Sequence, residues 1–133
     1  MTLIPFFSVG SIHFDISQHA LEIAMGKPIR RGRNRRDEEE LHYHNGIYRF
    51  DALGLVEMTL DVESISVAGQ MIRFKELAGF LKTGDEQVEE AVGFLVSPSY
   101  GIAVDPHFES WVTFMPRRRL TTWLGVAARR ETR

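Results

Sequence analysis

The two halves of this 133-residue chain read as the same unit twice. In each half a helix-like stretch rich in small apolar residues (17–28 and 74–85) leads through a charged spacer into segments of alternating apolar residues (42–61 and 94–116). The identity between the halves is weak, but element order, turn glycines and alternation are kept together, which chance similarity rarely produces. Two copies of a helix followed by antiparallel strands predict a helix-backed sheet with an open face.

The predicted fold is therefore α+β, with two tandem helix-plus-antiparallel-strand units that form one curved antiparallel sheet with the helices packed on one face. We expect a single domain over residues 1–133, because a chain of this length buries an adequate core. The first unit spans about 11–62, the second about 63–116, and a C-terminal extension covers 117–133. Apolar residues recur at helical spacing in that extension, which leaves open whether it is a docked helix or a frayed end.

The pair Asn45 and Gly46 lies between alternating segments and predicts a β-hairpin with a two-residue turn. Such a turn would pair His44 with Ile47. Alternation places one set of side chains in the core (Leu41, Tyr43, Tyr48 and Phe50) and the other set on the outward face (His42, His44, Ile47 and Arg49). Residues 29–40 show no apolar periodicity, so we expect a solvated loop there.

The outward face of the predicted sheet is the candidate binding surface. It would combine polar side chains with one large aromatic ring, and tryptophan and arginine dominate the energetics of protein interfaces when they are desolvated. The alternative is that Trp111 is covered by the C-terminal extension. The predicted partner-binding residues are His42, His44, Arg49, Glu57, Thr59, Asp61, Trp111 and Thr113.

Charge is strongly segregated although the net charge is only -2. Residues 37–116 contain 15 acidic residues and four basic ones, which predicts attraction for a basic protein partner. An arginine-rich segment precedes this acidic body and is the alternative site, for nucleic acid or for an acidic partner (Arg30, Arg31, Arg33, Arg35 and Arg36). The acidic run at 37–40 would repel a polyanion, so nucleic acid is the less favoured partner.

No catalytic pattern emerges from the sequence, so we expect a chain that is not an enzyme and has no cofactor and no small-molecule substrate. The chain contains no cysteine, which excludes disulfides and a cysteine nucleophile. His42 and His44 would share a strand face, but no third ligand is placed beside them, so no metal site is predicted. Neither a secretory signal nor a membrane-length apolar stretch is recognisable, so we expect a cytoplasmic protein without membrane contact.

The two-unit pattern resembles the beta-lactamase-inhibitor-protein-like fold, which is also found in the small outer-membrane lipoprotein A family. The residues that carry the resemblance are FDISQHALEIAMGKP, YHNGIYRFDALGLVEMTL, IRFKELAGFL, GFLVSPSYGIAVDP and WVTF. The pattern is also similar to small bacterial proteins encoded as immunity partners of secreted toxins. The resemblance implies a protein that binds and blocks a toxin, such as a nuclease with a basic active-site surface. The lipoprotein role would need a lipidated cysteine, which this chain lacks.

Overall fold

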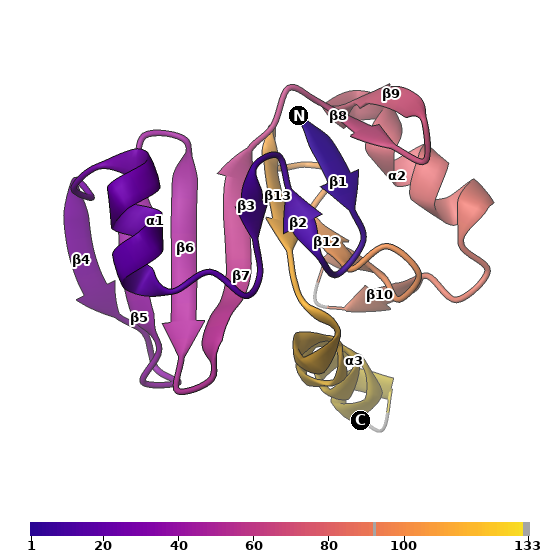
Figure 1. Ribbon diagram of the computed structural model, residues 1–133. Helices are drawn as coiled ribbons and strands as arrows, with labels where there is room; N and C mark the ends of the chain where they lie inside the picture. Colours follow the sequence, from indigo (N-terminus) through magenta and orange to yellow (C-terminus); the bar gives the residue numbers. More distant parts are fainter. Residues whose placement is uncertain (92, 132–133) are drawn as a thin grey trace.

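The computed structural model describes residues 1–91 and 93–131 (Figure 1), so the last two residues of the predicted C-terminal extension lie outside the described residues. The described part of the chain contains three helices and two sheets. The helices are α1 (Gln18–Met25), α2 (Phe74–Gly84) and α3 (Arg117–Glu131). No helix in the described part is both long enough and apolar enough to cross a membrane.

The larger sheet has eight strands in the order β10-β11-β12-β13-β7-β6-β5-β4, and all of its neighbours are antiparallel. It consists of two four-stranded meanders, each of which follows a helix in the chain, and the meanders meet where β13 pairs with β7. The strands are β4 (Arg30–Arg33), β5 (Glu39–Tyr43), β6 (Gly46–Asp51), β7 (Gly54–Asp61), β10 (Glu89–Ala91), β11 (Phe94–Ser97), β12 (Ile102–Val104) and β13 (Trp111–Phe114).

The smaller sheet has five strands in the order β3-β2-β1-β8-β9 and was not predicted. It joins the N-terminal segment to the hairpin before α2 through a parallel pairing of β1 with β8. The α+β class is confirmed, but the expectation of one sheet is wrong. β1 and β2 contain only three and two residues, which is too few to show alternation. The strands are β1 (Thr2–Ile4), β2 (Ser8–Val9), β3 (Ile12–His13), β8 (Ser64–Val67) and β9 (Gln70–Arg73).

The main core lies on one face of the larger sheet, where α1, α2 and the smaller sheet pack. Leu21 of α1 and Leu81 of α2 are fully buried there beside inward-facing strand residues such as Tyr48 and Phe114. Ser17 is the N-cap of α1, since its Oγ accepts a hydrogen bond from the backbone N–H of Ala20 at 3.0 Å.

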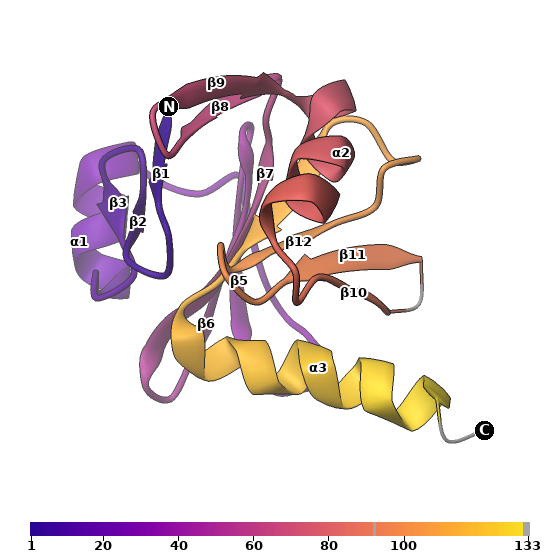
Figure 2. The ribbon, with the colours of Figure 1, turned by 90° about the vertical axis from the view of Figure 1, so that its right-hand side faces the viewer.

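Helix α3, which belongs to the C-terminal extension, packs on the opposite face, so the extension is a docked helix, while α1 and α2 lie together on the core face. Leu120 and Leu124 of α3 contact a second apolar cluster formed by Val96, Ala103 and Met115. Val96 and Ala103 alternate with residues of the main core along β11 and β12, and therefore point away from it. Figure 2 shows α3 lying apart from α1 and α2.

The hairpin of β5 and β6 has the predicted faces but a different register. Tyr43 pairs with Gly46, and Leu41 pairs with Tyr48, so the two turn residues are His44 and Asn45. The pairing differs from the predicted one by two residues, and a shift of two keeps every side chain on its face. Gly46 has a φ of 152°. A Cβ there would lie 2.1 Å from the backbone oxygen of Thr59, so this position requires glycine.

The arginine-rich segment forms a strand, which corrects the expectation of a solvated loop over 29–40. β4 pairs antiparallel with β5, with Arg30 opposite His42 and Arg33 opposite Glu39. β4 is the edge strand of the larger sheet, and its arginine side chains are exposed. Edge strands of this kind lack apolar alternation, so periodicity could not reveal it.

Candidate functional site

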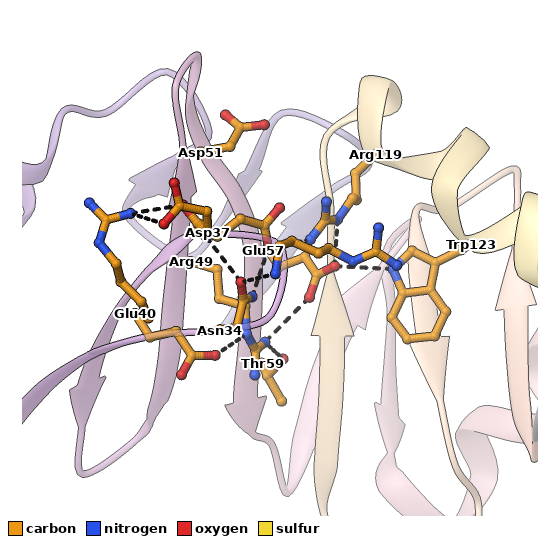
Figure 3. Close-up of polar contacts among 12 residues, drawn as sticks. Asn34, Asp37, Glu40, Arg49, Asp51, Glu57, Thr59, Arg119 and Trp123 are labelled. Carbon is orange, nitrogen blue, oxygen red and sulfur yellow. Dashed lines mark hydrogen bonds and ion pairs between the residues drawn. The ribbon is translucent and has the colours of Figure 1, made fainter.

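The outward face of the larger sheet carries an ion cluster at the start of α3, formed by Glu38, Glu40, Arg49, Glu57 and Arg119 (Figure 3). Arg119 is only 7% exposed, and it donates from Nε to Glu57 Oε2 at 2.6 Å and from Nη2 to Glu38 Oε1 at 2.7 Å. Arg49 donates from Nε to Glu40 Oε2 at 2.7 Å and from Nη1 to Glu57 Oε1 at 3.3 Å. The cluster holds three carboxylates and two guanidiniums.

Ion pairing shapes the titration of this cluster. Burial alone would raise the pKa of Glu38, but the hydrogen bonds from Arg119 and Asn34 outweigh it and hold the pKa below its ordinary value of 4.5. Burial likewise opposes ionisation of Glu40, and the hydrogen bond from Arg49 lowers its pKa overall. Burial would lower the pKa of Arg119, but its hydrogen bonds and ion pairs with Glu38 and Glu57 raise it overall. These groups are therefore all charged at neutral pH.

Trp123 of α3 links the ion cluster to an aromatic region. Its Nε1–H donates to Glu57 Oε2 at 3.3 Å, and its ring packs edge-on against Phe94 of β11 with 5.2 Å between centroids. Helix α3 is thus fixed to the sheet both by charge at Arg119 and by aromatic packing at Trp123.

An open cavity of about 500 Å³ lies beside Trp123 on this face. Four aromatic rings line it: Phe94 of β11, Phe108 of the turn after β12, Trp111 of β13 and Trp123 of α3. We call this cavity the aromatic groove. A concave site with convergent aromatic and polar side chains is the usual form of a binding site.

Five of the eight predicted partner-binding residues line the aromatic groove: Arg49, Glu57, Thr59, Trp111 and Thr113. Antiparallel pairing of β7 with β13 brings these segments together, since Thr59 lies opposite Thr113. Their hydroxyl oxygens are 2.9 Å apart, and Arg49 Nη1 donates to Thr59 Oγ1 at 2.9 Å.

The other three predicted residues lie away from the groove lining. His42 contacts Glu40 Oε1 at 3.3 Å and the Nη2 of Arg30 at 3.3 Å. His44 is exposed in the turn between β5 and β6, and Asp61 is exposed and accepts a hydrogen bond from Ser110 Oγ. Among the described residues, no group of three or more histidine or acidic side chains is arranged to hold a metal ion.

The outward face is less open and less acidic than the sequence suggests. Glu57 is only 7% exposed and lies between two guanidiniums, and α3 covers the part of the face that carries it. Trp111 is half-buried and lines the groove that α3 borders. The binding surface is therefore a groove beside α3 and not a bare sheet.

Sequence reasoning missed Phe94, Phe108, Asp105 and Trp123 as groove residues. Phe108 and Asp105 belong to a turn whose sequence has no periodicity. Trp123 carries a signal, because its helical spacing from Leu120 indicates that the C-terminal extension docks through one apolar side.

Most of the arginine-rich segment is engaged by acidic or imidazole side chains. Arg31 binds the carboxylate of Glu22, and Arg33 binds Asp37 Oδ1 at 3.0 Å. Arg35 and Arg36 are exposed in the turn between β4 and β5. Arginines that pair with acidic side chains of the same chain attract a polyanion less strongly. The segment therefore does not form a continuous basic surface.

Comparison with known proteins gives no relative. No protein-family model, curated protein or solved structure matches the chain.

Proposed function

We propose that this chain is a cytoplasmic immunity protein that binds and neutralises a secreted bacterial toxin. The observation that carries the proposal is the aromatic groove, in which Phe108, Trp111 and Trp123 converge with Arg49. Tryptophan, tyrosine and arginine in such settings supply most of the binding energy of protein interfaces. Arg49 is held in position in the groove wall by hydrogen bonds to Glu40 and Thr59.

The acidic body of the chain supports a basic partner. Residues 37–116 contain 15 acidic residues and four basic ones, and an excess of carboxylates remains after arginines outside this range pair with Asp37, Glu38, Asp51 and Glu57. Such a field accelerates encounter with a positively charged surface, as on a toxin that acts on nucleic acid, while a desolvated aromatic centre slows dissociation. Occupation of the toxin's active-site surface by the region around the groove would then block its activity stoichiometrically.

We also propose that residues 11–62 and 63–116 are tandem units of one ancestral design. In support, α1 leads into the meander β4–β7 and α2 leads into the meander β10–β13. The last strands of the two meanders pair antiparallel at the centre of the eight-stranded sheet. A duplication related by an approximate twofold axis produces this strand order, and it places the groove next to the junction of the two units.

The test is protection against the toxin encoded beside the gene for this chain, since immunity genes accompany their toxins. Cells that express the toxin should grow when the wild-type chain is co-expressed. We expect Phe108→Ala and Trp111→Ala each to raise the Kd for the purified toxin about 30-fold and to weaken protection.

The matched control is Leu53→Ala in the turn between β6 and β7. Leu53 is 80% exposed and Phe108 is 63% exposed, so neither change removes core packing. Leu53→Ala should leave the Kd unchanged. The proposal is wrong if the neighbouring gene product does not bind the chain, or if the groove variants bind it as tightly as the control does.

A further inference from the structure

The aromatic groove has the composition of a site for a cation. Four rings line one cavity, contributed by β11, β13, α3 and the turn after β12. The face of an aromatic ring is electronegative, so a guanidinium or ammonium group is attracted to it, most strongly by tryptophan. The chain shows this contact elsewhere, since the guanidinium carbon of Arg117 lies 4.1 Å from the centroid of the Phe6 ring.

A carboxylate lines the same groove. Asp105 follows β12, and its Oδ1 accepts a hydrogen bond from the backbone N–H of His107 at 2.9 Å. Among the side chains that the structure describes (residues 1–90 and 93–125), no hydrogen bond or ion pair engages its Oδ2. Asp105 is therefore held in place by one oxygen and can accept a donor from a ligand with the other.

The basic residue in the groove does not offset this charge. Arg49 is committed to Glu40, Glu57 and Thr59, and the ion cluster behind it has one more carboxylate than guanidinium. With Asp105 added, the groove and its wall are net negative. An anionic side chain would be repelled, whereas a cationic one is attracted by the carboxylate and by the rings.

We infer that the aromatic groove binds a lysine or arginine side chain of the protein partner, with its cationic group at Asp105 and its aliphatic stem between the tryptophan rings. The inference rests on the proposed function and names the anchor of that interface. A long cationic side chain suits the groove because its stem buries apolar area while its charged end reaches the mouth.

The experiment uses the whole chain and no toxin. The chain contains two tryptophans, and both line the groove, so the two indole N–H signals in an NMR spectrum report on it directly. The probe is acetyl-Gly-Arg-Gly-amide, and the matched probes replace arginine by citrulline, its neutral isostere, or by norleucine. We expect the arginine peptide to shift both indole signals saturably with a Kd on the order of 1–10 mM.

The citrulline and norleucine peptides should bind roughly threefold to tenfold more weakly. Asp105→Asn should raise the Kd of the arginine peptide roughly threefold, while Asp15→Asn, an exposed change outside the groove, should not. Asparagine retains the oxygen that accepts from His107, so the turn is preserved, and an unchanged unfolding midpoint verifies this.

Equal binding of the arginine and citrulline peptides, or equal Kd values for Asp105→Asn and Asp15→Asn, would overturn the inference. The groove would then be an apolar site without preference for a cation. If the arginine peptide binds as expected and the neighbouring toxin does not, the cation site stands and only the immunity function fails. If the toxin binds and the arginine peptide leaves the indole signals unmoved, the immunity function stands and the cation site fails.

Discussion

Replacement of Arg119 by methionine should destabilise the protein far more than the same replacement of its neighbour Arg118. Methionine fills much of the space of arginine but leaves the buried carboxylates of Glu38 and Glu57 without their shared partner. Breaking a buried ion pair on one side costs about 3–5 kcal/mol. The lower value applies because Glu38 keeps a hydrogen bond from Asn34 and Glu57 keeps Arg49.

We therefore expect Arg119→Met to lower the free energy of unfolding by about 3 kcal/mol at pH 7, and the melting temperature by roughly 9 °C. Urea unfolding followed by circular dichroism measures the change. The matched control is Arg118→Met on the adjacent position. Arg118 binds Asp51 Oδ2 at 2.5 Å with a side chain that is 35% exposed, so its loss should cost at most about 1 kcal/mol.

The pH dependence provides an independent check of the same reasoning. In the wild type the pKa of Glu38 is lowered, chiefly by Arg119 acting against burial. In the variant, protonation of Glu38 removes the cost of a buried unpaired charge, so the difference from the wild type should shrink as the pH falls from 7 to 4. The reasoning is refuted if Arg119→Met costs no more than Arg118→Met, or if the difference is the same at both pH values.

Three further outcomes can be measured by urea unfolding. Gly46→Ala should cost more than about 2 kcal/mol, because its Cβ would meet backbone atoms of β7. Gly32→Ala in β4 has open space and no left-handed φ, so a loss as large there would contradict this explanation. Asp85→Asn should cost about 2 kcal/mol, since Asp85 Oδ2 accepts from Ser97 Oγ at 2.6 Å and an amide nitrogen cannot; an unchanged midpoint would refute it. Burial would raise the pKa of Asp85, but this hydrogen bond lowers it overall, and the pKa of Glu38 is lowered too. The stability that these two carboxylates contribute should be full above their ordinary pKa values of 3.8 and 4.5 and should fall as the pH drops below them. Equal stability at pH 7 and pH 3 would contradict these pKa directions.

Local patterns explain the parts of the fold that the sequence predicts. Ser17 caps α1 through its own side chain, and the faces of β5 and β6 follow from alternation alone. Leu41 and Tyr48 are both buried as expected, although they pair directly with each other and not with the predicted partners. The turn sets the register of the hairpin, and alternation does not determine the φ angle of Gly46 on which that turn depends.

Contacts between distant segments explain what the sequence could not predict. Arg119 and Glu38 are 81 residues apart, and neither helical nor strand periodicity links positions so far apart in the chain. Five groove residues were predicted because β6, β7 and β13 share a face with known alternation, whereas Phe108 and Asp105 enter from a turn. β4 escaped detection because an exposed edge strand needs only backbone pairing, and its arginines carry no apolar signal.

The pairing of β7 with β13 has a consequence for the order of assembly. Thr59 and Thr113, which meet across this seam, are 54 residues apart in the chain. While a ribosome is still translating the second half, β7 pairs with β6 on one side, and its other edge is open to mispairing with other nascent chains. Synthesis of β13 closes that margin, and α3, which comes last, then clamps the finished sheet.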